Sequence, residues 1–189
     1  MIVDDERERR LRFDSGATWL DLVATVGFAH TATPLERLYD LDRLREWLAG
    51  EDLLPTDDLT AADLGLVTAL RRTLRVLAEA AVGSAAPPKK ALDQLNAVLA
   101  DDVPVAVRVN RAGALTVRRP ATVREALARV ARQAAEQLAG PVAATLRTCA
   151  DHDCSMVFID PNGRRRWCSA ETCGVRNRVR AHRERQRSM

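Results

Sequence analysis

The sequence predicts an α+β protein: a mostly helical N-terminal domain with a small β-hairpin, followed by a C-terminal unit organised by four cysteines. Three observations lead to this fold class. Leucine, valine and alanine recur every three or four residues in five segments of the first 140 residues, which is the spacing of one helix face. Valines alternate with other residues from 103 to 109, as in a strand. All four cysteines lie in the last fifth of the chain, in two close pairs.

Two short helices are predicted near the N-terminus. The first covers TWLDLVATVGF, residues 18–28. The second covers DLDRLREWLAG, residues 40–50, where Asp40 or Asp42 is a suitable N-cap and Gly50 a suitable stop. Leucines of this second segment repeat at spacings of three and four residues, which gives it one apolar face.

The next two segments are the longest helix and its successor. Thr60 with Asp63 resembles a capping box and opens an apolar stripe that Gly83 ends. A fourth helix is predicted in APPKKALDQLNAVLADD, where Pro88 stands near the start. Its leucines fall on one face, as expected for a helix that packs on a core.

A β-hairpin and a fifth helix complete this domain. The hairpin is VPVAVRVNRAGALTVRR, residues 103–119, with NRAG as its turn. The fifth helix opens with TVRE, where Thr122 caps the first turn and Glu125 reaches back, and it ends at Gly140. Leucine, valine and alanine are expected to supply the core because aromatic residues are only 4% of the chain.

Length and composition indicate one domain with a small appendage. The chain has 189 residues, 47% of them hydrophobic, which is enough for a real core. Its first residues, MIVDDERERRLRF, are charged, and no apolar run approaches the roughly 20 residues that cross a bilayer. We therefore expect a cytoplasmic protein with no membrane partner, divided into a domain at 1–140 and a second unit at 141–189.

The positive charge is concentrated at the C-terminal end. Residues 1–148 carry 20 basic and 21 acidic side chains, whereas residues 149–189 carry nine arginines and five acidic side chains. A basic segment on a nearly neutral body suggests a polyanionic partner, although charge runs also occur on plain solvated helix faces.

The cysteines have the spacing C-x4-C-x13-C-x4-C, formed by Cys149, Cys154, Cys168 and Cys173. Two close pairs separated by about a dozen residues suit a tetrahedral thiolate site, so one structural zinc ion is the natural occupant. Disulfides and an iron–sulfur cluster are less favoured alternatives. His152 is interpreted as an exposed loop residue, since four thiolates are already available.

The residues around the cysteines predict a small hairpin and a helix. Residues 156–160 are interpreted as a strand, 161–163 as a turn and 164–167 as the returning strand, with Phe158 and Trp167 as an apolar floor. After the last cysteine, a run without proline continues as a helix. Four of its arginines share one helix face: Arg176, Arg180, Arg183 and Arg187. Knuckle, hairpin and helix in this order indicate a treble-clef-like zinc finger.

The same residues resemble the CGNR zinc finger, a family named after the tetrapeptide at its last cysteine. Twelve positions match its pattern: Cys149, Cys154, Phe158, Asp160, Arg165, Arg166, Trp167, Cys168, Ser169, Cys173, Gly174 and Arg176. Upstream, LDLVATVGF followed by LERLYDLDRLREWLAG is similar to the opening of the ABATE domain, which is described as a stress-induced transcription regulator. Val175 stands where the family name has Asn, and Ala24 stands where the upstream motif has Asn.

The resemblance implies a bacterial transcription regulator with a ligand-binding or oligomerising N-terminal domain and a DNA-binding finger. Arginine suits this role because its planar fork grips phosphate or guanine. The residues expected to contact double-stranded DNA are Arg164, Arg165, Arg166, Arg176, Arg180, Arg183 and Arg187. One small finger gives modest affinity, so specific binding is expected to need a homodimer or a second contact.

The sequence favours two other functional classes less. A zinc-stabilised module that binds protein or RNA is the main alternative, and burial of Arg176 or Arg180 against the body would favour a protein partner. An enzyme is not expected: Asp21, His30 and Glu36 have no spacing that fixes an acid/base geometry, and four thiolates leave zinc no open position. No catalytic residue is assigned.

The effector site is not defined by the sequence. Most aromatic side chains of the large domain fall within about thirty residues: Trp19, Phe28, His30, Tyr39 and Trp47. They are interpreted as a core cluster, with a ligand pocket as the alternative. The ligand-binding residues and the identity of a small-molecule effector therefore stay unknown at this level.

Overall fold

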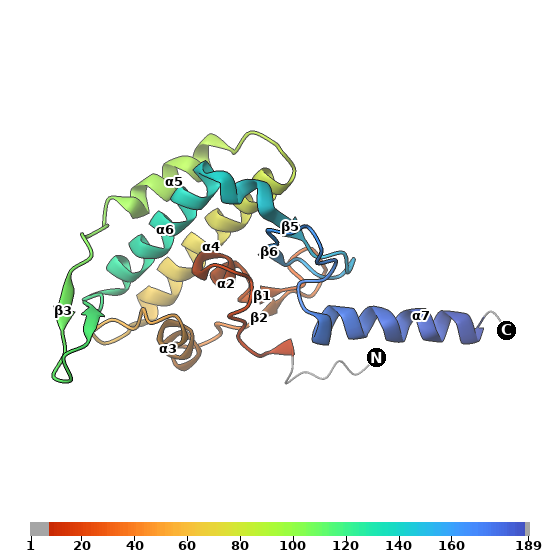
Figure 1. Cartoon of the computed structure of the whole chain (residues 1–189), viewed down its shortest axis with the longest axis horizontal. Helices are drawn as coiled ribbons and strands as arrows, with labels where there is room; N and C mark the ends of the chain where they lie inside the picture. The colour runs from red at the N-terminus through yellow and green to blue at the C-terminus, as the bar shows by residue number, and fades with distance from the viewer. Residues whose placement is uncertain (1–7, 188–189) are drawn as a thin grey trace.

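A computed structural model describes residues 8–187 as a helical body from which two elements project (Figure 1). The described helices are α2 (Thr18–Val23), α3 (Leu41–Gly50), α4 (Ala61–Val82), α5 (Lys89–Leu99), α6 (Val123–Ala139) and α7 (Val175–Arg187), with a 3-10 turn η1 (Pro141–Thr145) and a π-helical turn η2 (Ala170–Gly174). The strands are β1 (Val26–Gly27), β2 (Leu35–Glu36), β3 (Val107–Val109), β4 (Leu115–Val117), β5 (Leu146–Thr148) and β6 (Val157–Ile159). The mostly helical fold with small β-hairpins is therefore confirmed.

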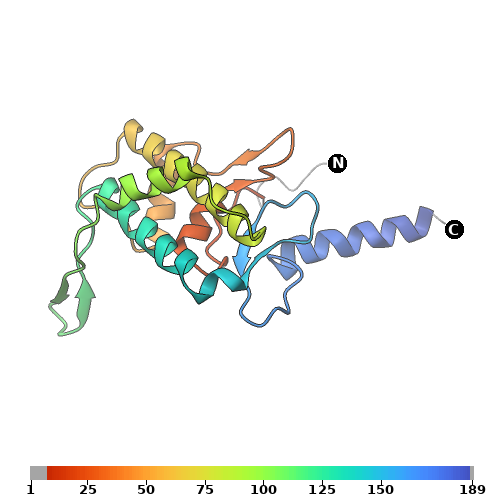
Figure 2. The same ribbon diagram turned by 90° about the horizontal axis from the view of Figure 1, so that it is seen from above.

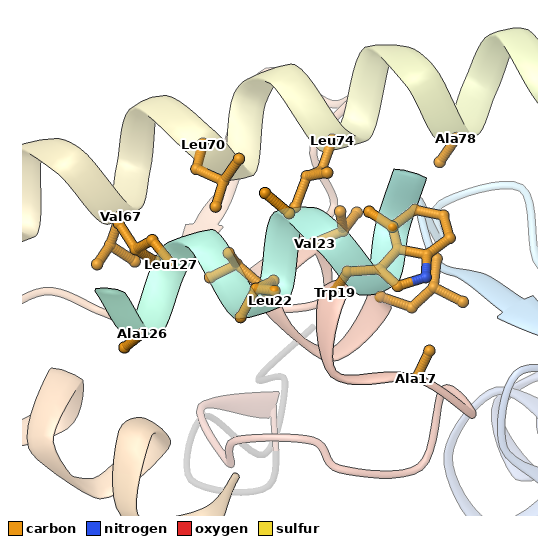
Figure 3. Close-up of a cluster of buried hydrophobic side chains, with 14 of the residues drawn as sticks. Ala17, Trp19, Leu22, Val23, Val67, Leu70, Leu74, Ala78, Ala126 and Leu127 are labelled. Carbon is orange, nitrogen blue, oxygen red and sulfur yellow. The ribbon is translucent and has the colours of Figure 1, made fainter. Parts of the chain in front are cut away.

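The core lies between α2, α4 and α6. Trp19, Leu22 and Val23 of α2 fill the space between α4 and α6. Leu74 of α4 and Leu127 of α6 belong to the same cluster (Figure 3). Trp19 and Trp47 are fully buried. Aliphatic side chains make up most of the core, as expected, but these two indoles are its largest buried members.

The helix starts agree with the caps expected from the sequence. The Asp40 carboxylate accepts a hydrogen bond from the Arg43 backbone N–H at 2.8 Å, and the Asp63 carboxylate accepts one from the Thr60 N–H at 2.7 Å. Thr122 caps α6 as predicted. Glu125 reaches back one residue further than expected, because its carboxylate accepts the N–H of Ala121 at 2.8 Å.

The predicted helix at 18–28 is wrong in its second half. The helix ends at Val23, and residues 26–27 form β1, which pairs antiparallel with β2. Phe28 then takes a left-handed backbone conformation with φ of 53°, which turns the chain away from any helical continuation. The pairing with a strand nine residues later decides this segment, and helical spacing alone does not reveal it.

The returning strand predicted at 164–167 is also wrong. β6 pairs antiparallel with β5, which precedes the first cysteine, so Thr148 faces Val157 and Leu146 faces Ile159. The cysteine knuckle is thus the connection inside this hairpin. Residues 141–148 form the 3-10 turn η1 and the strand β5.

The finger's hairpin is continuous with the body. Leu146 and Val157 are each 2% exposed and belong to the main core cluster. The Ile159 N–H donates to the Ser15 carbonyl at 2.9 Å, and the Asp160 N–H donates to the Thr145 carbonyl at 2.9 Å. Body and finger therefore share packing and backbone hydrogen bonds.

Two elements leave the body at opposite ends. The predicted hairpin at 103–119 is confirmed as β3 and β4, and it extends from one end, while α7 extends from the other (Figures 1 and 2). Within residues 8–187, no helix combines the length and the apolar content that crossing a bilayer requires.

One buried carboxyl group in this body predicts a pH effect on stability. Asp21 is 4% exposed and accepts the Ser15 N–H at 2.9 Å. Burial raises its pKa to about 7. The folded state therefore holds this proton more tightly than the unfolded state, so stability falls as pH rises from about 4 to about 7.

Asp21→Asn keeps the acceptor oxygen and removes the titration. We expect the variant to be more stable than the parent by on the order of 2 to 4 kcal/mol at pH 8, with the difference shrinking toward pH 5. Denaturant unfolding at several pH values measures this difference. The exposed Asp58→Asn variant serves as the control, and an Asp21→Asn difference that does not change with pH would contradict the assignment.

Candidate metal centre and its arginine shell

The first cysteine pair lies in the knuckle between β5 and β6. The Cys149 N–H donates to the Met156 carbonyl at 3.0 Å, and the Cys154 N–H donates to the Asp151 carbonyl at 2.8 Å. These two bonds close the knuckle and turn both sulfurs to the same side. Such short loops are how zinc fingers present a pair of thiols to one ion.

The second pair is positioned by a loop and by η2. Gly163, with φ of 63°, makes the turn after β6, and its N–H donates to the Asp160 carbonyl at 3.2 Å. The Asp160 carboxylate accepts the Arg165 N–H at 2.8 Å. The chain then returns to the knuckle, where the Ala150 N–H donates to the Arg166 carbonyl at 3.1 Å.

The four thiols form one cluster of metal-binding geometry. All four sulfurs lie within 4.8 Å of one another, with 3.7 Å between Cys154 and Cys168 and 3.5 Å between Cys168 and Cys173. Four sulfurs held tetrahedrally at about 2.3 Å from one zinc ion lie about 3.8 Å apart. All four are free thiols. The cluster fits one structural zinc ion. Four cysteine ligands would fill its tetrahedral coordination and leave no site for water or substrate.

Hydrogen bonds among the four thiols shift their pKa values in opposite directions: the bonds with Cys149 raise the pKa values of Cys154 and Cys173 above the ordinary value. Hydrogen bonds from the other thiols, Cys154 first, hold the pKa of Cys149 well below its ordinary value. The Cys168 N–H lies 3.4 Å from the Cys149 sulfur. A zinc ion held by these four sulfurs would supply the positive charge that stabilises their thiolate forms.

Arg12 is a partner of this cluster that sequence reasoning missed. Its guanidinium donates to the Cys168 sulfur at 3.2 Å and to the Cys168 carbonyl at 3.3 Å. Burial alone lowers the pKa of Arg12, but the hydrogen bond to Asp14 and the nearby Cys168 sulfur raise it above its ordinary value. No local sequence signal joins residues 156 positions apart, so only the fold reveals this contact.

An apolar floor lies under the cysteines, as predicted. Phe158 is fully buried, and Trp167 packs against the same small cluster. The Arg165 guanidinium stacks over the Phe158 ring at 4.5 Å, and Arg166 stacks over Trp167 at 4.8 Å. Arg165 also donates to the Cys168 carbonyl. Of the two, Arg165 is therefore tied directly to a cysteine of the cluster.

Two of the predicted DNA contacts form ion pairs with carboxylates of the protein itself. Arg176 pairs with Glu8 and with Asp151, the latter at 3.1 Å, and lies over the Phe28 ring at 5.2 Å. Arg180 pairs with Asp151 at 2.8 Å and with Asp153 at 2.5 Å. The Asp151 side chain is completely buried. These contacts fasten the first two turns of α7 to the knuckle.

The other predicted DNA contacts are exposed. Arg164, Arg165 and Arg166 lie on the loop after β6, and Arg183 and Arg187 lie on the outer half of α7. Arg178 and Arg185, which are not among the predicted contacts, are exposed on the same helix. His152 is an exposed residue of the knuckle, its ring 3.0 Å from the Asp153 carboxylate, and it lies outside the four-thiol cluster.

The three acid/base candidates do not converge. Asp21 is buried and accepts a hydrogen bond from the Ser15 N–H. Glu36 pairs with Arg71 at 2.5 Å, and His30 lies 3.4 Å from Glu79 on the surface. Each side chain therefore has a separate structural partner.

The aromatic residues do not share one pocket either. Trp19 and Trp47 are core residues, Tyr39 is 55% exposed, and Phe28 lies under Arg176. A cavity of about 530 Å³ lies elsewhere, between α4, α5, α6 and η1. It is lined by small and aliphatic side chains with one amide, Asn96.

Comparisons with known proteins identify both parts of the chain. A family model described as "Putative stress-induced transcription regulator", named ABATE, matches residues 16–141, and a model of the CGNR zinc finger matches residues 145–186. Neither is an enzyme family. A comparison with curated proteins gives no match. The chain therefore belongs to the ABATE family and carries a CGNR zinc finger over residues 145–186.

Proposed function

We propose that this protein is a zinc-dependent, DNA-binding transcription regulator of the bacterial cytoplasm. In this proposal Cys149, Cys154, Cys168 and Cys173 bind one zinc ion, residues 141–189 bind double-stranded DNA, and residues 1–140 serve ligand sensing or dimer formation. The family supports a zinc-finger regulator in general terms. The observation that carries the DNA-binding step is the projection of α7 away from the body with exposed arginines (Figure 2).

The arginines divide into two groups with different roles. Arg176 and Arg180 hold α7 against the knuckle through buried Asp151, so a DNA contact by either would require exchange of these ion pairs. We assign them the orientation of the helix. The exposed arginines carry the phosphate contacts: Arg164, Arg165 and Arg166 from the loop, and Arg183 and Arg187 from the outer turns of α7.

This division agrees with the electrostatics of nucleic-acid binding. An exposed guanidinium that neutralises a phosphate releases about one counterion from the DNA. A guanidinium that is already paired with a carboxylate releases few. The outer half of α7 also lies clear of the helical body (Figure 1). A duplex can therefore approach these side chains without meeting the body.

A salt series tests the proposal on the full-length protein. If about five arginines meet phosphate, log Kd for a random duplex should change with log salt with a slope of magnitude about 4 to 5. The double variant Arg183→Ala with Arg187→Ala should lower that magnitude by about 2 and weaken binding. Fluorescence anisotropy at several salt concentrations, with zinc content measured in parallel, gives both quantities.

A matched control removes the same charge elsewhere. Arg72 of α4 and Arg111 at the tip of the β-hairpin are exposed and far along the chain from α7. The double variant Arg72→Ala with Arg111→Ala should keep the parent slope. An equal loss in both double variants would show a nonspecific charge effect and contradict the assignment to α7.

The second candidate is a zinc-stabilised protein-interaction module. The intramolecular pairing of Arg176 and Arg180 favours it, because fewer arginines remain for a polyanion. A protein with one zinc per chain and no salt-dependent DNA binding would support this candidate and overturn the first.

A further inference from the structure

The projecting hairpin carries an uncovered apolar face. Val107 faces Val117 and Val109 faces Leu115 across the two strands, so these four side chains lie on one side, while Arg108 and Thr116 lie on the other. The four are 55 to 75% exposed. Val103 and Val105 continue the stripe at 41 and 43% exposure. No other part of residues 8–187 covers this face.

The base of the hairpin, which we call the arm, is anchored to the body. Arg119 donates to the Leu54 carbonyl at 2.8 Å and to the Pro55 carbonyl at 3.1 Å. Arg118 pairs with buried Glu125. An isolated two-stranded hairpin with an apolar face is marginal in water, and such a face on a protein surface usually marks an interaction site. These anchors hold the arm away from its own body.

The same chain offers a complementary surface. The cavity of about 530 Å³ lies where α4 ends, α5 begins and α6 passes into η1, with Leu92 at its rim 39% exposed. Thirteen residues line it, none of them charged. The lining suits aliphatic side chains and not a polyanion or a charged peptide.

The arm cannot reach the cavity of its own chain, but it can reach the cavity of a second copy related by a two-fold axis. The arm leaves from the C-terminal end of α5 and returns at the start of α6, whereas the cavity lies at the opposite ends of these two helices. The seven residues from Val103 to Val109 would span about 23 Å if fully extended, close to the roughly 25 Å of α6. When two copies pack with these helices antiparallel, each arm extends over the other copy's cavity.

Interface size also favours exchange over contact between arms alone. Six apolar side chains per copy are far fewer than the roughly 20 to 30 residues per side of a stable interface. Reciprocal exchange adds the thirteen cavity residues of each copy, which brings each side close to that range.

We propose that the protein forms a two-fold homodimer by arm exchange, in which the apolar face of the β3–β4 hairpin of each copy packs into the α4, α5, α6 and η1 cavity of its partner. The inference rests on the proposed function in one respect: the dimer brings together two fingers, which that proposal takes to bind DNA. Its test uses no DNA, so its failure leaves the finger's DNA binding untouched.

Sedimentation velocity of the full-length zinc protein over a concentration series tests this dimer. We expect a species of twice the 20.8 kDa chain mass for the parent. Leu115→Asp on the arm and Leu92→Asp at the cavity rim should each raise the dimer Kd by about 100-fold or more, because each places a carboxylate in an apolar contact twice per dimer. Thr116→Asp, on the other face of the same strand, should leave the Kd unchanged.

Mixing separates arm exchange from pairing between arms. The Leu115→Asp chain keeps an intact cavity and the Leu92→Asp chain keeps an intact arm, so their mixture regains one of two contacts and should dimerise more tightly than either alone. Circular dichroism and zinc content verify folding, and Leu115→Ser or Leu92→Ser replaces the aspartate variant at the same position if that variant misfolds. A monomeric parent, a dimer insensitive to Leu115, or a dimer sensitive to Leu115 but not to Leu92 would overturn the proposal.

Discussion

Cys168→Ser is expected to abolish zinc binding and unfold the finger. Cys168 is 1% exposed, and its sulfur lies within 3.7 Å of two other cysteine sulfurs. A serine hydroxyl does not ionise to replace the thiolate, and structural zinc contributes roughly 10 to 16 kcal/mol of apparent binding free energy in small fingers. The small floor of Phe158 and Trp167 cannot offset a loss of that size.

Metal analysis after dialysis and thermal unfolding measure this loss. Zinc should fall from near one per chain to a small fraction, and the unfolding temperature should drop because β5 and β6 belong to the shared core. His152→Ala, which changes an exposed residue inside the same knuckle, should retain the zinc. A Cys168→Ser protein that kept one zinc per chain and the parent stability would rule out the four-cysteine assignment.

Asp151→Ala should detach α7 from the knuckle while the zinc stays bound. The Asp151 side chain is completely buried and holds Arg176 at 3.1 Å and Arg180 at 2.8 Å. Removing one member of a buried ion-pair network costs about 3 to 5 kcal/mol. Because Glu8 and Asp153 still neutralise the two arginines, we expect roughly 2 to 4 kcal/mol here.

Hydrogen exchange along α7, with denaturant unfolding and metal analysis, measures this effect. Exchange in the first two turns of α7 should accelerate, while zinc stays near one per chain. The matched control is Asp153→Ala, whose side chain is 36% exposed and whose ion pair with Arg180 should contribute less than about 1 kcal/mol. Equal effects of the two substitutions would show that burial of Asp151 is not what secures the helix.

Local signals in the sequence predict most of the body. The caps at Asp40, Thr60 and Thr122 all appear in the structure because they involve residues three positions apart. The predicted helix over 18–28 fails beyond Val23 because β1 needs β2 as its partner, and that pairing depends on a turn through Phe28. Helical spacing does not contain this information.

The finger shows the same limit. The cysteine spacing predicts the cluster, since each pair is close in sequence and both short loops are local. The strand partner of β6 is missed because the turn after Asp160 suggests a hairpin on the wrong side. The roles of Arg12, Arg176 and Arg180 depend on carboxylates and sulfurs brought together from 25 to 168 positions away, which only the fold specifies.

The strand pair that carries the knuckle also limits how this finger can be exchanged between proteins. Leu146 and Val157 belong to the core of the helical body, and the backbone carbonyl of Ser15 accepts a hydrogen bond from the Ile159 N–H. A finger transplanted onto another protein would expose both aliphatic side chains, and a body cut before β5 would be left with a gap in its place. Descendants of this chain are therefore expected to inherit the two parts together, and recombination should be tolerated at the hairpin tip near Gly113 sooner than at the junction near Gly140.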